Sequence, residues 1–328
     1  MLENKYKISV IVPVYKAEKF VQRCVYSLLN QDLDRVEFIF INDGTPDKSF
    51  QIIRQITSQS HRNGDVVLLE NKKNIGIAQT RRKGMLEATG KYVIQIDSDD
   101  WVEPTMLSSL YAKIEEEGSD VVVCDYYISY KTTERYMREE YKKDIEYNIK
   151  NMMLGNLHPS FCTTLIRRAF YMENDLIPTG EINMGEDIET MLRLFSLTSK
   201  VSYLPKAFLH YTQYNTLSLT KTMGESSIND AIVFISKLED FVRKSEINYE
   251  QEFCSMIVFY KKVFTLNKRY TKYFYTIYPE ANKFKYIFMY KSYGLPQKIA
   301  MSFMLIKMPF VTRAIYKTHM WIRKKIRS

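Results

Sequence analysis

Three carboxylates follow directly on an apolar segment of the chain. The segment is Tyr92–Ile96, and Asp97, Asp99 and Asp100 come within the next four residues. Like charges at this spacing repel one another unless a positive group neutralises them. A divalent cation suits that task, because Mg²⁺ and Mn²⁺ take oxygen ligands and use one or two protein carboxylates in phosphate chemistry. As an alternative, Asp99 or Asp100 caps a helix that begins near residue 103.

The elements around this segment alternate between strands and helices. Apolar, β-branched runs predict strands at 8–14, 36–41, 66–69, 92–96 and 121–124, and apolar residues at helical spacing predict helices at 17–29, 50–56, 77–88 and 106–114. This alternation predicts an α/β fold with a mostly parallel central sheet and helices on both faces. Ligands of such sheets bind at the carboxyl ends of the strands, where residues 13–15, Asp43 and the three carboxylates fall.

The loop after the first strand excludes two common nucleotide sites. Residues 15–20 contain no glycine, so the Gly-x-Gly-x-x-Gly of dinucleotide-binding proteins is missing at its diagnostic position, and the sequence holds no P-loop motif. Asp43 follows the second strand and could accept a hydrogen bond from a base or a ribose. Alternatively, Asp43 stabilises its own turn with Gly44.

Five fragments together resemble the family 2 glycosyltransferases of the GT-A fold. They are Val10–Tyr15, Asn42–Thr45, Asn74–Gly76 with Arg81, Ile96–Trp101 and Gly185–Asp187. A sixth fragment, from Tyr203 to Tyr211 with Ser218, is similar to the end of that catalytic domain. The resemblance implies a catalytic domain over residues 1–220. We expect the remaining residues, 221–328, to form a mainly helical, basic region.

The resemblance also implies roles for particular residues. The donor nucleotide would be held by Pro13, Val14, Tyr15, Glu18, Asp43, Asn74, Arg81, Asp97 and Ser98. Within this set Asp43 would meet the uracil ring, Arg81 the diphosphate, and Asp97 the ribose or donor sugar. Asp99 would hold Mn²⁺ or Mg²⁺. The chain departs from the family's common Ala-Arg-Asn at residues 80–82.

Asp187 matches the general base of the family. A carboxylate that takes the proton of an attacking hydroxyl gives inversion at the anomeric carbon when no covalent intermediate forms. The alternative is an acid in the first turn of a helix, where it complements the helix dipole. His210 could be a further metal ligand, although a lone histidine beside aromatic residues is more often packed or hydrogen-bonded. The cysteines are widely separated, which indicates reduced, buried thiols.

The basic residues of the chain are concentrated at its end. The 328 residues include 47 Lys and Arg against 38 Asp and Glu, and residues 281–328 hold 11 of the basic residues and no acidic one. No apolar run approaches the ~20 residues that span a bilayer. A basic, amphipathic tail indicates binding to an anionic membrane surface. Alternatively, it packs on the catalytic domain. No nucleic-acid module is present, so we expect no nucleic-acid partner.

The sequence therefore predicts a metal-dependent, inverting glycosyltransferase. It would move a sugar from a nucleoside-diphosphate sugar, with UDP as the carrier, to a hydroxyl of a glycan or lipid-linked oligosaccharide in surface polysaccharide synthesis. With no apolar segment before Ile8, we expect a cytoplasmic protein, peripheral on the inner face of the cell membrane. Two other classes stay open. A sugar-nucleotide-forming nucleotidyltransferase would carry a Gly-rich loop at residues 15–20, and a non-catalytic nucleotide-sugar binding module would not need Asp187.

Overall fold

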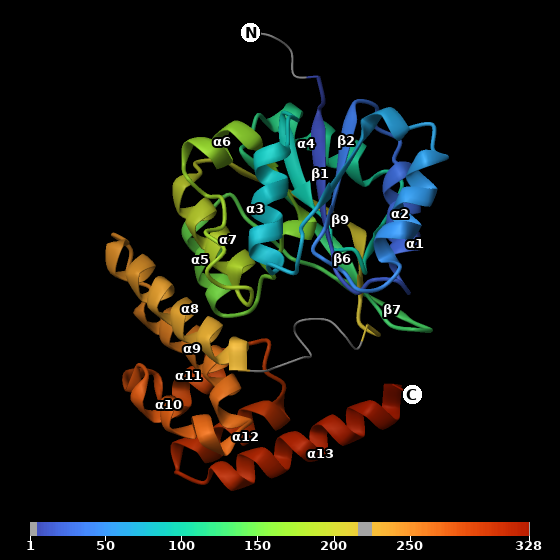
Figure 1. Ribbon diagram of the computed structural model, residues 1–328. Helices are drawn as coiled ribbons and strands as arrows, with labels where there is room; N and C mark the ends of the chain where they lie inside the picture. The colour runs from blue at the N-terminus through green and yellow to red at the C-terminus, as the bar shows by residue number, and fades with distance from the viewer. Residues whose placement is uncertain (1–4, 216–224, 328) are drawn as a thin grey trace. The chain divides into compact units, whose positions relative to one another are not determined.

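The computed structural model describes residues 5–215 and 225–327, with side chains as far as residue 319. Ser218 lies outside the described residues. The chain divides into two compact units (Figure 1). The first consists of Met1–Ile145 and Pro159–Thr222, and the second of Glu146–His158 and Met223–Ser328. The second unit thus includes residues 146–158, which fall within the range expected for the catalytic domain.

A central sheet forms the first unit. Within residues 5–215 its nine strands are β1 (Ile8–Val14), β2 (Val36–Asn42), β3 (Val66–Glu70), β4 (Tyr92–Gln95), β5 (Trp101–Val102), β6 (Val121–Ser129), β7 (Glu134–Met137), β8 (Thr164–Arg167) and β9 (Val201–Thr212). Their order is β3-β2-β1-β4-β8-β6-β9-β5, with β7 paired to β6. The first four strands in this order are parallel to one another, whereas β8 is antiparallel to β4 and β6. The mostly parallel sheet predicted from the sequence is confirmed.

Helices cover both faces of this sheet (Figure 1). They are α1 (Val21–Leu29), α2 (Ser49–Ser58), α3 (Ile77–Glu87), α4 (Met106–Glu117), α6 (Arg168–Glu173) and α7 (Glu186–Leu197). The even-numbered residues of β1 join an apolar core with buried residues of α1, α2 and α4. Ile11 belongs to the opposite face, towards α3, where a Cβ at Gly84 would lie only 2.4 Å from Ile11 Cγ2. Glycine at this position therefore lets α3 approach the strand closely.

The second unit is helical, as expected for the C-terminal region. Its helices are α5 (Ile145–Met153), α8 (Glu225–Lys244), α9 (Glu250–Tyr260), α10 (Thr271–Thr276), α11 (Phe284–Met289), α12 (Leu295–Leu305) and α13 (Pro309–Arg327). Phe234, Phe253, Phe264 and Phe274 are fully buried in its core. α12 packs against both α11 and α13.

Two further expectations concern the whole chain. The cysteines, Cys24, Cys124, Cys162 and Cys254, are all buried and free, as the sequence predicted. Over residues 5–215 and 225–327, no helix combines the length and the apolar character that crossing a membrane requires.

Candidate active site

The loop after β1 is fixed by the loop after β2. Backbone N–H groups of the first loop donate hydrogen bonds to side chains of the second: Lys16 to Thr45 Oγ1 (2.8 Å), Ala17 to Ser49 Oγ (2.9 Å) and Glu18 to Asp47 Oδ2 (3.1 Å). In return, the Lys48 N–H donates to Glu18 Oε2 at 3.2 Å. Because these bonds hold residues 15–20 as a loop, α1 begins at Val21, four residues later than the apolar spacing predicted.

Four of the predicted donor-binding residues lie in this loop or at the end of β1 before it. Pro13 and Val14 are buried at the end of β1, whereas Tyr15 and Glu18 are exposed. Lys16 Nζ lies 5.0 Å from the centroid of the Tyr15 ring. The loop thus offers an exposed aromatic ring beside a positive charge at the carboxyl edge of the sheet.

Asp43 organises the loop that follows β3. Its Oδ1 accepts hydrogen bonds from Asn71 Nδ2 (3.1 Å) and the Ile75 N–H (2.8 Å). Its Oδ2 accepts from Asn74 Nδ2 (2.9 Å) and the Gly76 N–H (3.1 Å). These four bonds match the lone-pair capacity of an ionised carboxylate, and Asp43 is only 3% exposed. The structure therefore brings two predicted residues, Asp43 and Asn74, together by a direct bond.

Arg81 links two acidic segments that are far apart in the sequence. Its Nη2 donates to Asp97 Oδ1 at 2.7 Å, and its Nη1 pairs with Glu186 Oε1. The guanidinium also lies 5.2 Å from the centroid of the Phe161 ring, and Arg81 is 4% exposed. Burial opposes the charge of Arg81, but Asp97 and Glu186 outweigh it and raise the pKa of the guanidinium. Arg81 is thus a charged bridge between the loop after β4 and the start of α7.

Glu186 and Asp187 form the first turn of α7. Gly185 precedes them with a φ of 96°, a left-handed conformation that favours glycine. Burial raises the pKa of Glu186 above its ordinary value, while the charge of Arg81 lowers it. Asp187 is partly exposed, and its Oδ1 accepts from the Ile188 N–H at 2.8 Å. Glu186 is therefore buried and held by Arg81, whereas Asp187 is accessible at the surface of the unit.

The three carboxylates after β4 lie in different surroundings. Asp97 and Asp99 are partly exposed, whereas Asp100 is 1% exposed and Ser98 is also buried. Asp99 Oδ2 accepts from Asn215 Nδ2 at 2.8 Å, and Asp100 Oδ1 accepts from the Thr212 N–H at 2.8 Å. Burial, together with the charges of Asp99 and Asp97, raises the pKa of Asp100 well above its usual range.

The alternative role as a helix cap is wrong for both Asp99 and Asp100. α4 begins at Met106, its N-cap residue is Thr105, and the carboxylates instead bond to β9 and the residues that follow it. Within the described part of the chain, one group of possible metal ligands consists of Asp97, Asp100 and Cys162, whose ligand atoms lie within 4.8 Å of one another. Asp100 Oδ2 is buried there without a hydrogen-bond partner.

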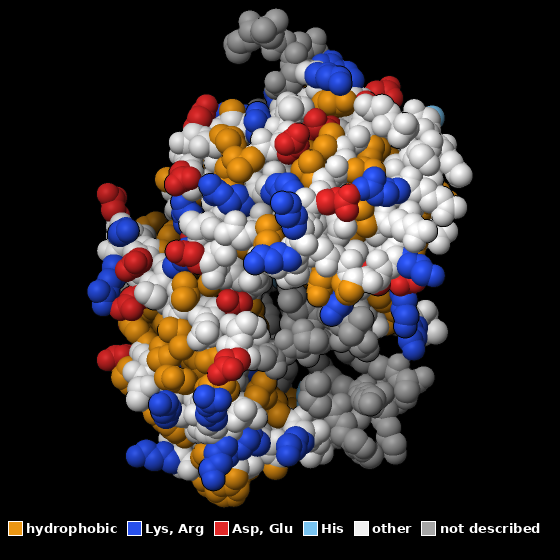
Figure 2. Space-filling model, viewed as in Figure 1, with side chains coloured by type: hydrophobic (Ala, Val, Ile, Leu, Met, Phe, Trp, Pro, Cys, Tyr) orange, Lys and Arg blue, Asp and Glu red, His pale blue; other side chains and the backbone are white. Residues whose placement is uncertain are grey.

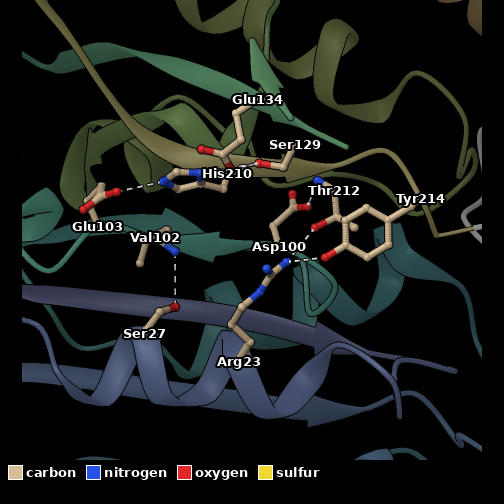
Figure 3. Close-up of polar contacts among 10 residues, drawn as sticks. All are labelled: Arg23, Ser27, Asp100, Val102, Glu103, Ser129, Glu134, His210, Thr212 and Tyr214. Carbon is tan, nitrogen blue, oxygen red and sulfur yellow. Dashed lines mark hydrogen bonds and ion pairs between the residues drawn. The ribbon is translucent and has the colours of Figure 1, made fainter. Parts of the chain in front are cut away.

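His210 lies in β9 beside this acidic loop, and Figure 3 shows its surroundings. Its Nε2 faces Glu103 Oε1 at 2.9 Å, and its Nδ1 faces Glu134 Oε1 at 2.8 Å. The ring stacks between Trp101, with centroids 3.4 Å apart, and Tyr127, with centroids 4.8 Å apart. Both nitrogens therefore face carboxylates, and metal binding by His210 would require one glutamate to leave.

The sequence model of the family described as Glycosyl transferase family 2 matches residues 9–174, which is half of the chain. The chain belongs to glycosyltransferase family 2. The resemblance found in the sequence is thereby confirmed, and so is the enzyme class, because the relatives are named as glycosyltransferases. Membership of this family therefore excludes the two alternative classes, a nucleotidyltransferase and a non-catalytic binding module.

Several relatives of this family 2 glycosyltransferase are bacterial. Glycosyltransferase GlyA of Streptococcus pneumoniae is 30% identical over 62% of this chain, but the chain spans only 30% of GlyA. The cholesterol galactosyltransferase of Borreliella burgdorferi is 28% identical, over 80% of this chain and 73% of the relative. Residues 1–349 of Staphylococcus aureus TarS, solved with UDP-GlcNAc, superpose with a TM-score of 0.65 at 17% identity, covering 96% of this chain and 92% of TarS 1–349. This last likeness confirms the GT-A fold.

Reasoning from the sequence missed several residues of the candidate site. Glu186 was noticed only as the neighbour of Asp187, although it is the buried partner of Arg81. Asn71 and Asn215, which bond to Asp43 and Asp99, carried no pattern that marks them. A signal was available for Glu186 alone, because an acid in the first turn of a helix is stabilised by the helix dipole.

Proposed function

We propose that this enzyme is a metal-dependent, inverting glycosyltransferase that uses a UDP-sugar and glycosylates a hydroxyl of a glycan acceptor in surface polysaccharide synthesis. The observation that carries the proposal is the bridge from Asp97 through Arg81 to Glu186. It joins the acidic loop after β4, where a donor would bind, to the turn that presents Asp187. One relative supports the choice of donor and pathway, because TarS was solved with UDP-GlcNAc and is named as a poly(ribitol-phosphate) β-N-acetylglucosaminyltransferase.

The residues present fit a divalent cation at the acidic loop. Asp97 and Asp99 are partly exposed oxygen donors, and Asp100 Oδ2 is a buried oxygen without a partner. We assign the metal to Asp99, because Asp97 already pairs with Arg81 and Asp100 is closed to solvent. Mn²⁺ or Mg²⁺ bound there would stabilise negative charge on the departing diphosphate. A mannosyltransferase of this fold, from Pyrobaculum calidifontis, was solved with GDP-mannose and Mn²⁺.

The chain's own residues divide the remaining work. Tyr15, exposed at the end of β1, would pack on the base of the nucleotide. Asp43 would shape that pocket through the loop at residues 71–76, and could bond the base only by exchanging one of its present partners. Arg81, buried between two acids, would position Asp97 and α7 and add positive charge behind the diphosphate.

Asp187 would complete the reaction as the general base. It would accept the proton of the acceptor hydroxyl as that oxygen attacks the anomeric carbon and the bond to the diphosphate breaks. A single base on the face opposite the leaving group gives inversion, so an α-linked donor yields a β-linked product. Glu186 cannot share this task, because its carboxylate is buried against Arg81.

Thermal stabilisation by a panel of UDP- and GDP-sugars, with and without Mn²⁺, tests the donor and the metal together. A ligand that binds only the folded protein stabilises it by about 2.7 kcal/mol at a hundred times its Kd. We expect a UDP-sugar to stabilise the protein only with Mn²⁺, and Asp99→Ala to lose this effect. The exposed Asp34→Ala is the matched control. Equal stabilisation of Asp99→Ala and the wild type would contradict the metal assignment, and preference for a GDP-sugar would contradict the donor.

We further propose that the enzyme is cytoplasmic and peripheral on the inner face of the cell membrane, with a lipid-linked oligosaccharide as its acceptor. The acid-free, basic composition of residues 281–328 supports this. An acceptor held at the membrane would meet the active site at high local concentration if the enzyme lay on the same surface.

A further inference from the structure

A row of exposed apolar side chains runs along α12. Leu295 is 64% exposed and Ile299 42%, and Ile306, the C-cap residue directly after the helix, is 52% exposed. At 100° per residue these positions fall within about 40° of one another around the helix axis, so they share one side. Ala300, Met301 and Met304 lie on the other side and are fully buried. The helix is therefore apolar on both sides, and only one of them is used for packing within the second unit.

The neighbouring helices α11 and α13 also expose aromatic residues. Phe284 and Phe288 lie four residues apart on α11 and are 51% and 49% exposed. Lys298 of α12 donates to the Phe288 carbonyl at 2.9 Å, and its Nζ lies 5.7 Å from the centroid of that ring. Phe310, in the first turn of α13, is 63% exposed. We call Phe284, Phe288, Leu295, Ile299, Ile306 and Phe310 the apolar row.

All charged residues in the stretch of sequence that contains the apolar row are basic. Between residues 281 and 319 the chain has seven Lys or Arg and no Asp or Glu. Lys285, Lys291, Lys307 and Lys317 are exposed. In Figure 2 the lower end of the second unit, where α12 and the start of α13 lie, shows blue and orange side chains and no red ones. A partner for this surface must therefore combine negative charge with a place for exposed Leu, Ile and Phe.

We propose that the apolar row with its flanking lysines binds the surface of an anionic lipid bilayer. A bilayer meets both demands, because its headgroups attract lysines and its acyl boundary accepts apolar side chains. A second copy of the chain is disfavoured, because a two-fold interface would set one acid-free, positive surface against another. This inference rests on the proposed peripheral location. It goes further, because it assigns membrane binding to a defined face of α11 and α12 and not only to the positive charge of the C-terminal tail.

Vesicle binding by the full-length protein tests the proposal. We expect binding to phosphatidylcholine vesicles only when phosphatidylglycerol is included, with weaker binding at high salt. Leu295→Ser with Ile299→Ser should lower the partition coefficient at least tenfold, because exposed leucine and isoleucine would lose their contact with the acyl boundary. Lys291→Gln with Lys307→Gln should lower it by about fivefold per lysine and reduce the salt dependence.

Two leucines of the first unit provide the matched control. Leu86 is 55% exposed and Leu197 50%, so Leu86→Ser with Leu197→Ser removes similar exposed area elsewhere and should leave vesicle binding unchanged. Stabilisation by nucleotide sugars, measured on every variant, separates loss of lipid binding from loss of the donor site. Equal binding by Leu295→Ser/Ile299→Ser and wild type would overturn the proposal. So would a wild-type dimer in sedimentation that this variant abolishes, without vesicle binding by either protein.

Discussion

Arg81 in the first unit and Lys261 in the second are both buried basic side chains, but their partners differ. Arg81 is paired with two carboxylates, those of Asp97 and Glu186. Lys261 is 0% exposed, and its Nζ donates to the Tyr278 carbonyl at 3.2 Å and to Asn282 Oδ1 at 2.7 Å. The acids raise the pKa of Arg81 despite its burial, whereas burial lowers the pKa of Lys261 to about 7, against the opposing effect of Glu280.

The partners decide whether each buried side chain keeps its charge. Arg81 lies in a charged network suited to catalysis, whereas Lys261 lies in a hydrogen-bonded network of the core of the second unit. A cation between two acids keeps its charge and fixes both acids in place, which a site for a charged donor requires. A lysine among neutral oxygens can give up its proton and still donate two hydrogen bonds. Substitutions in the acidic network of the first unit should therefore affect sugar transfer and leave buried charges unpaired. Changes at Lys261 should affect stability and its pH dependence, but not transfer.

Asp187→Asn should produce the largest effect. The amide keeps the shape of the side chain but cannot accept a proton at neutral pH, so transfer should fall by about 10²–10⁴ while donor affinity stays within a few-fold. Steady-state transfer, together with donor titration, measures both quantities. Glu189→Gln is the matched control, because Glu189 also lies in the first turn of α7 and pairs with Arg193. Weak donor binding with normal residual turnover would show that Asp187 is structural.

Arg81→Met should have the next largest effect, this time on stability. Removing one partner of a buried ion pair leaves the other charge unpaired and typically destabilises by about 3–5 kcal/mol. Glu186 is 5% exposed, so this applies to it more strongly than to Asp97. Urea unfolding of Arg81→Met measures the change in the free energy of unfolding.

The double variant Arg81→Met with Glu186→Met sharpens this prediction. Replacing both members of a buried pair by apolar residues is often neutral, so it should recover much of the lost stability. Sugar transfer by the double variant should nevertheless be slower than by the wild type, because no ion pair then links α7 to Asp97. A double variant that is both stable and fully active would show that the bridge has no role in positioning Asp187.

The sequence predicted elements well where one local pattern decides the structure. β1 is buried along its whole length, and such a strand needs a continuous apolar run that can be read directly. The start of α1 was misplaced because the preceding loop is held by hydrogen bonds that it donates to Thr45 and Ser49, and no local signal reports contacts between residues 29 or 32 positions apart. The carboxyl edge of the sheet was located correctly because it lies where these apolar runs end, and their ends can be read directly from the sequence.

Pairings between distant residues could not be predicted. Arg81 and Glu186 are 105 residues apart, and neither carries a spacing that identifies the other. The apolar row on α12 presents a second limit. The spacing of Leu295, Ile299 and Ile306 fits a buried side as well as an exposed one, and only the packing of Ala300, Met301 and Met304 decides between them.

Lys261→Met should leave transfer unchanged and tests the other half of the comparison. The pKa of Lys261 is about 7 in the folded protein and near 10.5, the ordinary value, in the unfolded chain. Between these values the unfolded chain binds more protons, so the free energy of unfolding rises with pH, by at most about 1.4 kcal/mol per pH unit. The variant should lose this slope between pH 7 and 10.

Urea unfolding at several pH values within this window gives the two slopes. Methionine leaves the Tyr278 carbonyl and Asn282 Oδ1 without their donor, which costs about 1–3 kcal/mol at every pH and so shifts the curve without tilting it. The exposed Lys272→Met serves as the control and should keep the wild-type slope. Parallel curves for the wild type and Lys261→Met would mean that Lys261 stays protonated when buried, and that the two cations differ in their partners but not in their charge.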